Sequence, residues 1–396
     1  MFMFVKSNRI ITDQGMISGI LNIDEGRIIE ILPPTARVAI DIDAEDHRIL
    51  PGIIDTHNHG TMGYGLMGEQ ENPEAVVRGY LKGLASQGVT ACLPTADFSL
   101  FEAIVKVAQG PIGGAKPIGI HSEGPYLNRV GEKGIDTGHP DIDLQHVQDM
   151  IDTAQGMLKL VAIAPELPGA KAAIELLSSQ GVRCAFAHSN ALYQEALTSF
   201  DWGITVTTHT ANVMEGIHHR RMGGLGACLL NDEVYNELIC DGLHVANEMI
   251  ELMLRVKKNP YDRFMMVSDN VPMAGAPIGR YHLSGMFDIN IDEQGYCLSD
   301  TGRLCGSTLP VIRGIRNLAE NLHLPLTEIV KMSSRNPALV YGATHKGRLA
   351  AGMDADFIII DEDYQVLKTF SEGHCVYDAE TDTDLFNPEF LKACAC

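Results

Sequence analysis

From residue 51 onward, short apolar runs alternate with segments of helical period, and this alternation constrains the fold more than any other feature of the chain. Amphipathic helices are predicted over 73–87, 170–180 and 247–258, ending at Gly88, at Gly181 and near Pro260. Repeated βα units over roughly 300 residues are typical of an α/β protein with a (β/α)8 TIM-like barrel, and an open doubly wound sheet is the alternative. The eight predicted strands are 52–55, 89–93, 117–120, 158–164, 182–187, 204–208, 237–240 and 264–267.

The two ends of the chain are rich in short β-type runs. Turn residues such as Asp24-Glu25-Gly26 and Pro33-Pro34 separate the first set, and residues 325–342 predict a late helical link before the second. Chain termini often lie close together, so one small β-sandwich domain can use both. We therefore expect residues 1–50 and 347–396 to form a β-sandwich domain and residues 51–346 to form the barrel. The predicted strands are 5–11, 19–23, 27–32, 37–42, 356–361, 365–369 and 374–377.

Composition restricts the classes of function. A length of 396 residues fits one large domain and one smaller domain. The formal charge of -21, from 30 basic and 51 acidic residues, argues against a general nucleic-acid or anionic-membrane binder. No apolar run approaches the roughly 18–20 residues of a membrane span, and the first residues lack the pattern of a signal peptide. We expect a cytoplasmic protein.

The nine cysteines are scattered, odd in number and without a CxxC pair. This usage is typical of free thiols in a reducing compartment. Cys394 and Cys396 lie in the last residues, where we expect a mobile tail.

Histidines and acids follow several of the predicted strands. The first strand ends in His57-Asn58-His59, and residues two apart on an extended segment point to the same face. In a barrel of this type the carboxyl ends of the strands carry the active site. Later strand ends add HSE (121–123), His188, His209, DGLH (241–244) and Asp269.

Each of these residues also has an ordinary structural explanation. A lone Asp after a strand is usually a helix cap, a lone buried His is usually a core residue, and Glu123 could be a salt-bridge partner. Six strand ends with such residues at once favour a metal site instead. We predict His57, His59, His188 and His209 as nitrogen ligands and Glu123 as a carboxylate between two ions. Asp269 is predicted to be a further metal ligand and the group that moves a proton.

These residue types suit hydrolysis. Nitrogen and carboxylate ligands that leave one position open allow a bound water to lose its proton near neutral pH. Imidazole and carboxylate suit zinc, iron and manganese alike. We expect one or two divalent ions, with zinc first and iron or manganese as alternatives.

The chain resembles the amidohydrolase superfamily, and within it the N-acetylglucosamine-6-phosphate deacetylase family, over essentially its whole length. The segment KGRLAAGMDADFIIID (346–361) is similar to the entry into the second half of that superfamily's β domain. As a set the motifs are highly specific for the superfamily and moderately specific for the deacetylases. They are PGIIDTHNHG (51–60), HSEGPYLN (121–128), AHSNA (187–191), THTANVM (208–214), DGLHV (241–245), SDNVPMAG (268–275) and LCGSTLP (304–310).

The resemblance implies roles for individual residues. Glu123, His188 and His209 match the principal metal ligands, His57 and His59 match the additional pair of two-metal members, and Asp269 matches a catalytic Asp at the metal. It also implies a small-molecule amino sugar phosphate as substrate, and a homodimer. The positions that match substrate contacts are Asn212, Val213, Arg220, His244, Cys305 and Gly306.

A cluster of cationic and imidazole side chains, His218-His219-Arg220-Arg221, stands out in an otherwise acidic chain. Arg binds phosphate through two parallel hydrogen bonds, which favours this cluster as the phosphate end of the site. A solvated basic turn is the structural alternative.

One motif departs from the family. Members usually follow EGP with Lys-Gly-x-His, but here Asp136 stands in the place of that His, and His139 comes three residues later. Either His139 takes over the contact with substrate or a second ion polarises the carbonyl. This departure makes N-acetylgalactosamine-6-phosphate, or another acylated amine, an alternative substrate to N-acetylglucosamine-6-phosphate.

We therefore predict a metal-dependent deacetylase of an N-acetylated amino sugar 6-phosphate, with Asp269 as acid and base. A hydrolase of cyclic amides or a deaminase is the alternative within the superfamily, and the 218–221 cluster argues against it because an uncharged ring has no need of cations. A catalytically inactive barrel acting as a binding protein is the alternative of another class. It would lack a ligand or the Asp, and here all are present.

Overall fold

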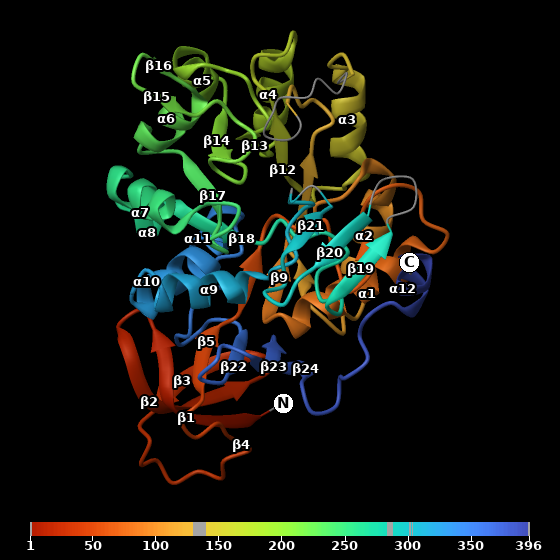
Figure 1. Cartoon of the computed structure of the whole chain (residues 1–396). Coiled ribbons are helices and arrows are strands. Elements are labelled where there is room, and N and C mark those ends of the chain that lie inside the picture. The colour runs from red at the N-terminus through yellow and green to blue at the C-terminus, as the bar shows by residue number, and fades with distance from the viewer. Residues whose placement is uncertain (1, 130–139, 283–287, 301, 303, 395–396) are drawn as a thin grey trace.

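The computed structural model describes residues 2–129, 140–282, 288–300, 302 and 304–394. Within these residues, eight parallel strands surround one axis, with helices outside them (Figure 1). A two-residue strand, β10 (Lys116–Pro117), also pairs with β9. The barrel strands are β6 (Ile53–Asp55), β9 (Val89–Cys92), β11 (Ile120–Glu123), β12 (Leu158–Ile163), β13 (Arg183–Phe186), β14 (Ile204–Thr207), β17 (Tyr235–Ile239) and β18 (Phe264–Val267).

Two short backbone contacts close the ring of strands. A bridge between Thr95 and His121 joins β9 to β11, and a bridge between Asn58 and Asn270 joins β6 to β18. At the second junction the His59 N–H donates to the Asn270 carbonyl at 2.8 Å. Closure confirms the (β/α)8 barrel and excludes the open sheet.

The helices begin and end where local chemistry predicts. In α1 (Pro73–Ser86) the Asn72 side chain accepts from the Ala75 N–H at 3.2 Å, Pro73 occupies the first turn, and Gly88 follows at φ 83. The predicted link at 325–342 is interrupted by η2 (Lys331–Arg335), a π-helical turn. The remaining helices are η1 (Phe98–Leu100), α2 (Phe101–Ala108), α3 (Leu144–Thr153), α4 (Ala170–Ser179), α5 (Tyr193–Phe200), α6 (Gly224–Leu230), α7 (Asn247–Val256), α8 (Pro260–Arg263), α9 (Val311–Glu320), α10 (Leu326–Val330), α11 (Asn336–Val340) and α12 (Pro388–Cys394).

Two apolar layers hold the barrel. The larger one lies between the strands and the helices, and includes Tyr80, Phe101 and Phe186. A smaller cluster of Leu, Ala, Val and Met side chains from the strands fills the interior, with Tyr341 packed against it. The polar strand ends therefore rest on a packed interior rather than on an open channel.

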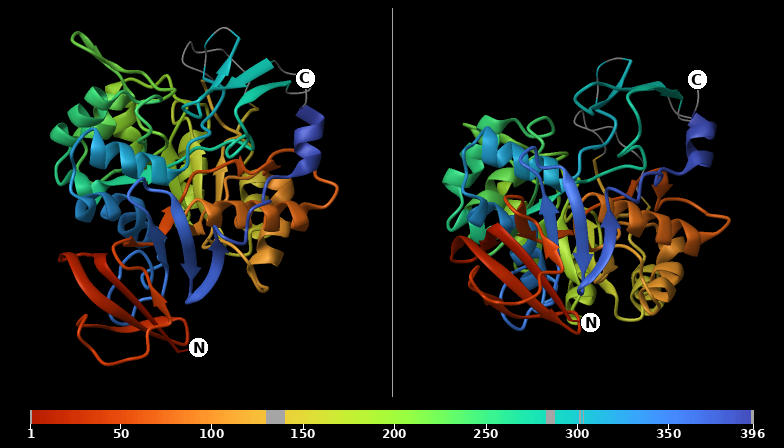
Figure 2. Two further views of the ribbon diagram at one scale, coloured as in Figure 1. Left: turned by 60° about the horizontal axis from the view of Figure 1, so that its bottom comes forward. Right: turned by 90° about the horizontal axis from the view of Figure 1, so that it is seen from below.

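Strands from both ends of the chain form one mixed sheet beside the barrel (Figure 2). Its order is β24-β23-β22-β5-β1-β2-β3, and its own core includes Val5, Leu21, Ile49 and Phe357. This confirms a barrel with a terminal sheet domain. The strands are β1 (Met3–Thr12), β2 (Gly15–Asp24), β3 (Arg27–Leu32), β5 (Arg48–Pro51), β22 (Phe357–Ile360), β23 (Val366–Ser371) and β24 (His374–Asp378).

The strand predicted at 37–42 is wrong. Only β4 (Ile42–Asp43) pairs there, with Val5 and Lys6 of β1. Arg9 and Ile10 of β1 pair with β5 on the same side of the strand. Residues 37–41 therefore find few unpaired backbone groups of β1. The domain boundaries at 50/51 and 346/347 remain our proposal.

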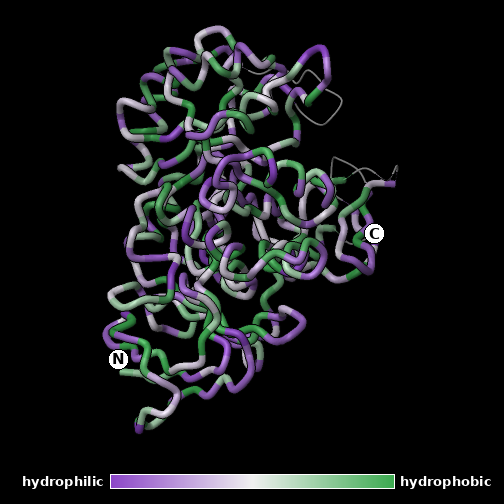
Figure 3. The backbone as a smooth tube through the Cα atoms, turned by 90° about the vertical axis from the view of Figure 1, so that its left-hand side faces the viewer, coloured by the Kyte–Doolittle hydropathy of each residue, from purple (hydrophilic) through white to green (hydrophobic). Residues whose placement is uncertain are grey.

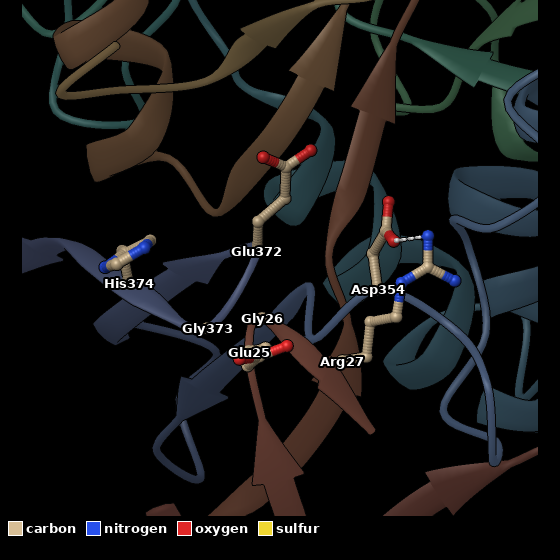
Figure 4. A pocket seen from close by; sticks show the side chains of 7 residues that line it. All are labelled: Glu25, Gly26, Arg27, Asp354, Glu372, Gly373 and His374. Atoms are coloured by element: carbon tan, nitrogen blue, oxygen red, sulfur yellow. Dashed lines mark ion pairs between the residues drawn. The ribbon is translucent and has the colours of Figure 1, made fainter. Parts of the chain in front are cut away.

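Charged residues join the two chain ends to the barrel. Lys346 contacts Asp356 at 2.8 Å, Asp354 at 3.0 Å and Glu372 at 3.3 Å. Beside this cluster lies a cavity of about 350 Å³ between the β2–β3 turn and the β23–β24 turn, where Arg27 pairs with Asp354 at 3.8 Å (Figure 4). The sheet is thus joined by ion pairs as well as by backbone hydrogen bonds.

A three-stranded antiparallel sheet that was not predicted follows the last barrel strand. It consists of β19 (Gly279–His282), β20 (Asp288–Ile291) and β21 (Cys297–Ser299), and α12 packs against it through Phe390 and Leu391. Cys394 is only 5% exposed in this cluster, so the expectation of a mobile tail is wrong for that residue. Cys396 lies outside the described residues.

In the part of the chain that the structure describes, no helix combines the length and the apolar character needed to cross a bilayer. Hydrophobic and hydrophilic segments are interleaved along the backbone (Figure 3). Two small hairpins complete the secondary structure: β7 (Gly60–Thr61) with β8 (Tyr64–Gly65), and β15 (Ile217–His218) with β16 (Arg221–Met222).

Candidate metal and active site

The six residues predicted as metal ligands gather at the carboxyl ends of the barrel strands in two groups. Each group brings three ligand atoms within 4.8 Å of one another. We call them the first group and the second group. The first group is His57, His59 and Asp269, and the second group is Glu123, His188 and His209.

Glu123 contacts histidines of both groups. Its Oε1 atom lies 3.0 Å from His188 Nε2 and 3.1 Å from His209 Nε2, while Oε2 lies 3.0 Å from His59 Nε2. Oε1 is also 3.5 Å from His57 Nε2. One carboxylate therefore faces both groups, which is the position needed for a bridge between two ions.

The remaining distances within the groups are equally short. In the first group, His57 Nε2 lies 3.2 Å from His59 Nε2 and 3.4 Å from Asp269 Oδ1. In the second, the Nε2 atoms of His188 and His209 are 3.0 Å apart. Two imidazole nitrogens this close together would repel each other through their lone pairs. A proton or a metal cation between them removes that repulsion.

The carboxylates of Glu123 and Asp269 favour positive charge at the site. Burial by itself lowers the pKa of His57, but the charges of Asp269 and Glu123 outweigh it and raise that pKa well above its usual value. In the same way the pKa of His59 is raised to about 9. Burial raises the pKa of Asp269, yet the surrounding imidazoles lower it overall. The potential at this end of the barrel thus attracts a cation.

Three of the six residues have left-handed backbone conformations. His188 has φ 45, His209 has φ 26 and Asp269 has φ 51. Non-glycine residues rarely adopt such angles, and they cluster at functional sites where the surrounding structure holds them. The turn after each of these strands thus directs a side chain across the end of the barrel rather than into a helix.

A buried network holds the first group at the seam of the barrel. Asp55 accepts from the Ser268 hydroxyl at 2.6 Å and from the Asn58 amide at 3.1 Å. Burial raises the pKa of Asp55 to about 6, although these hydrogen bonds oppose the change. The network ties β6 to β18 beside His57 and Asp269, so the relative position of the two ligands depends on it.

Backbone and side-chain contacts also fix the second group. His188 Nδ1 faces the Arg129 carbonyl at 2.7 Å, which directs Nε2 toward Glu123. Glu166 accepts from the Ser189 hydroxyl at 2.7 Å and from the Asn190 N–H at 2.6 Å. The loop that carries His188 is therefore held on both sides.

The donor set fits a divalent cation. Ligands about 2.0–2.2 Å from a tetrahedral zinc ion lie about 3.3–3.5 Å from one another. The separations of 3.0–3.5 Å among these nitrogen and oxygen atoms are close to that spacing. Imidazole and carboxylate together suit zinc, iron or manganese.

An open cavity of about 500 Å³ adjoins the second group. Asn212 and His244 line it, together with apolar side chains such as Met249 and Leu252. The Asn212 amide donates to the His209 carbonyl at 3.2 Å, so this residue connects the cavity wall to a predicted ligand. His244 Nδ1 lies 2.6 Å from Asp241, whose pKa is lowered although burial opposes that change.

The other residues predicted to contact substrate lie in three places. Val213 has φ 49, and its carbonyl accepts from the Ser189 N–H at 3.2 Å, beside His188. Arg220 is exposed in the β15–β16 hairpin, whose first residue, Ile217, lines the 500 Å³ cavity. Cys305 and Gly306 precede Ser307, which is bridged to Asn270 next to Asp269. Asp136 and His139 lie outside the described residues.

Two buried residues of the site were not among the predicted site residues. Glu237 faces His57 from the middle of β17, and His121 packs its ring against His57 at a centroid distance of 4.7 Å. Burial lowers the pKa of His121, which keeps this imidazole neutral. A charged residue within an apolar strand was the available signal for Glu237.

Comparison with known proteins agrees with this geometry. The Amidohydrolase family matches residues 48–376. An N-acetylglucosamine-6-phosphate deacetylase of Vibrio furnissii is 31% identical, covering 84% of this chain and 84% of the relative. An N-acetylgalactosamine-6-phosphate deacetylase of Escherichia coli O157:H7 is 32% identical, covering 93% and 98%.

Solved structures support the same assignment. The chain is similar to a mutant N-acetyl-D-glucosamine-6-phosphate deacetylase of Mycobacterium smegmatis in complex with N-acetyl-D-glucosamine-6-phosphate, with a TM-score of 0.81 and 27% identity. That match covers 95% of this chain and 99% of the other. The match to the family model and the identity to curated relatives show that this chain belongs to the amidohydrolase family, within the group of N-acetylated amino sugar phosphate deacetylases.

Proposed function

We propose that this protein is a metal-dependent deacetylase that hydrolyses the acetamide of an N-acetylated amino sugar 6-phosphate, with N-acetylglucosamine-6-phosphate as the first candidate substrate. The observation that carries the proposal is the contact of Glu123 with both groups, next to Asp269 at the strand ends. Relatives of this activity cover most of the chain, which supports the choice of substrate class.

In this proposal Asp269 moves the proton. A divalent ion, when bound, supplies an acidified water and polarises the acetyl carbonyl. Asp269 accepts a proton from the water as the water oxygen bonds to the acetyl carbon. It then donates this proton to the sugar nitrogen, so that the C–N bond breaks and acetate and the free amine leave. Its second oxygen is available for this task because Oδ1 is the atom that faces His57 and His59. His57, His59, Glu123, His188, His209 and Asp269 would hold the metal.

The sugar would occupy the cavity next to the second group. Asn212 and His244 offer polar contacts there, and Cys305 with Gly306 would border the substrate from the side of Asp269. Arg220 supplies the cation that a phosphate requires in a chain with a net charge of -21. We propose Val213 as a further contact through its backbone, and retain Asp136 and His139 as candidates.

N-acetylgalactosamine-6-phosphate is the second candidate substrate. The altered motif at Asp136 and the 32% identity to the Escherichia coli enzyme of that name both favour it. The two sugars differ only at one hydroxyl, so a site with one additional hydrogen bond can separate them strongly.

Acetate release from matched acetylated amino sugars tests the proposal. We expect turnover of N-acetylglucosamine-6-phosphate or N-acetylgalactosamine-6-phosphate by the zinc-loaded enzyme, and loss of turnover after chelation. The unphosphorylated sugars are the control. Equal turnover with and without the 6-phosphate would contradict the substrate assignment, and full activity of the chelated protein would contradict the metal.

Three finer points belong to the same proposal. We propose zinc ahead of iron and manganese, which reconstitution with each ion separately would test. We also propose a homodimer, supported by exposed apolar side chains at Ile217 and Leu252, which line the cavity. Sedimentation at equilibrium measures the oligomeric state. Finally we propose a cytoplasmic location, supported by buried cysteines that form no disulfide among the described residues, such as Cys92, Cys184 and Cys228.

A further inference from the structure

We infer that Glu237 is the positioning residue for His57, and that the metal affinity of the first group depends on its carboxylate. This inference rests on the proposed metal-dependent function. Neither residue has any exposed surface. Glu237 lies in the middle of β17, on the far side of the His57 ring from the other members of the first group.

The contacts use both edges of the His57 ring. Nδ1 lies 3.4 Å from Glu237 Oε2. Nε2, at the opposite edge, lies 3.2 Å from His59 Nε2 and 3.4 Å from Asp269 Oδ1. Glu237 therefore stands behind the ring and cannot share the ligand position that Nε2 occupies.

Glu237 is itself held in place. The Thr56 hydroxyl donates to its Oε1 atom at 2.9 Å, and Thr56 directly precedes His57 in the chain. The Glu237 carbonyl accepts from the Thr210 N–H at 2.7 Å, next to His209. Both carboxylate oxygens are thus engaged at the base of the site, which a residue needed only for packing would not require.

The direction of the hydrogen bond between His57 and Glu237 determines which nitrogen of His57 can bind a metal. A carboxylate only accepts, so His57 carries a hydrogen on Nδ1, and Nε2 is the nitrogen that gives up its hydrogen when the ring binds a cation. An imidazole backed by a carboxylate is a stronger and better oriented metal ligand. Without Glu237 the buried Nδ1–H would lose its acceptor, and the other tautomer would place the hydrogen where the ion must bind.

The other histidines have different outer partners. His188 Nδ1 faces the carbonyl of Arg129 at 2.7 Å, and His209 Nδ1 has no hydrogen-bond partner in the described part of the protein. Among these three predicted ligands, as described in the structure, a carboxylate backs His57 alone. Loss of Glu237 should therefore weaken the first group and spare the second.

Zinc binding to the metal-free protein, measured by chelator competition, tests this inference. We expect Glu237→Gln, which keeps an acceptor but loses the charge, to weaken one phase of the isotherm by about 10- to 100-fold. Glu237→Leu should remove that phase. The other phase, which reports zinc binding to the second group, should keep its affinity. The graded order Glu, Gln, Leu distinguishes ligand positioning from packing.

Asn236→Leu is the matched control. Asn236 is a fully buried polar residue on the same strand, and its amide donates to Thr207 at 2.8 Å. Both Leu variants should lower thermal stability, but Asn236→Leu should bind zinc as the wild type does.

Three outcomes decide between the proposals. A wild-type protein that binds none of zinc, iron(II) and manganese(II) would overturn the proposed function itself. Wild-type binding by Glu237→Leu, with only a lowered Tm, would overturn the role of Glu237 and leave the function standing. If Glu237→Leu does not fold, the near-isosteric Glu237→Gln decides by the same isotherm.

Discussion

Asp269 is proposed to combine two roles, as a metal ligand and as the group that moves a proton. Its Oδ1 atom contacts His57 and His59, and its backbone has φ 51, a conformation that directs the side chain across the barrel end. A ligand that also moves a proton can be tested by separating the two tasks, because an amide keeps an oxygen but cannot accept a proton.

We expect Asp269→Asn to reduce kcat by at least about 10²- to 10⁴-fold, the usual contribution of general acid–base catalysis. Metal content, measured by elemental analysis, should stay close to that of the wild type because His57, His59 and Glu123 remain. Loss of metal together with activity would show that Asp269 acts mainly as a ligand.

The site residues that could be predicted from the sequence are those that directly follow a recognisable strand. His57, Glu123 and Asp269 each follow an apolar run, and a barrel brings such ends together. Asp55 and Glu237 could not be predicted in the same way. A buried charge inside a strand gains its meaning from partners such as Ser268 and His57, which are about two hundred residues away in the chain.

At the scale of elements, the loop that carries Cys305 and Gly306 is under tight steric control. Gly306 has φ +81, and a Cβ atom there would lie 2.3 Å from Cγ1 of Val271, two residues after Asp269. The backbones of this loop and of the Asp269 loop can approach only because residue 306 has no side chain.

We expect Gly306→Ala to shift the loop and to reduce kcat/KM by about 10- to 100-fold, as small displacements near a reacting group do. Gly302→Ala is the matched control, since Gly302 also has a positive φ, +74, but no atom of the described residues lies within 4 Å of its Cβ position. It should cost about 1–2 kcal/mol of stability and little activity. Equal losses of activity in both variants would contradict steric control.

Secondary structure could be predicted where strands and helices alternate regularly. It could not be predicted where other elements interrupt this alternation. All eight barrel strands lie on or next to predicted runs, since alternation with amphipathic helices is a strong signal. The sheet of β19–β21 breaks that alternation with strands of three or four residues, too short for a periodic pattern. The same holds for η2, whose π-helical turn leaves no mark in hydrophobic spacing.

For the whole molecule, the ion cluster around Lys346 joins the segment after α11 to the terminal sheet. Lys346 is 7% exposed and Asp356 is 2% exposed. Removing one partner of a buried pair costs about 3–5 kcal/mol, because the other charge is left without compensation. Lys346→Met should therefore lower the free energy of unfolding by about that amount, and Lys346→Met with Asp356→Leu should restore part of it. Urea unfolding measures both.

The same cluster predicts a pH dependence. Burial lowers the pKa of Lys346, but Asp356 and its neighbours outweigh it and raise the pKa above the ordinary value of 10.5. A raised lysine pKa stabilises the fold fully below pH 10.5 and less as the pH rises through the folded-state pKa. Above the acidic range in which Asp356 and its neighbours take up protons, the difference in unfolding free energy between wild type and Lys346→Met should be constant up to pH 10.5 and shrink at higher pH. A difference that grows with pH would contradict this account.

The junction between β18 and β6 determines when the site can exist during synthesis. Glu123 and His209 are 86 residues apart in the chain, whereas Asp55 and Ser268, which support the first group, are 213 apart. The second group can assemble from the middle strands while the ribosome still holds the last one. The ligands of the first group come together only after β18, the eighth barrel strand, has been synthesised and has paired with β6, the first. Maturation of a two-metal centre would then proceed in a fixed order, with the barrel seam as its last step.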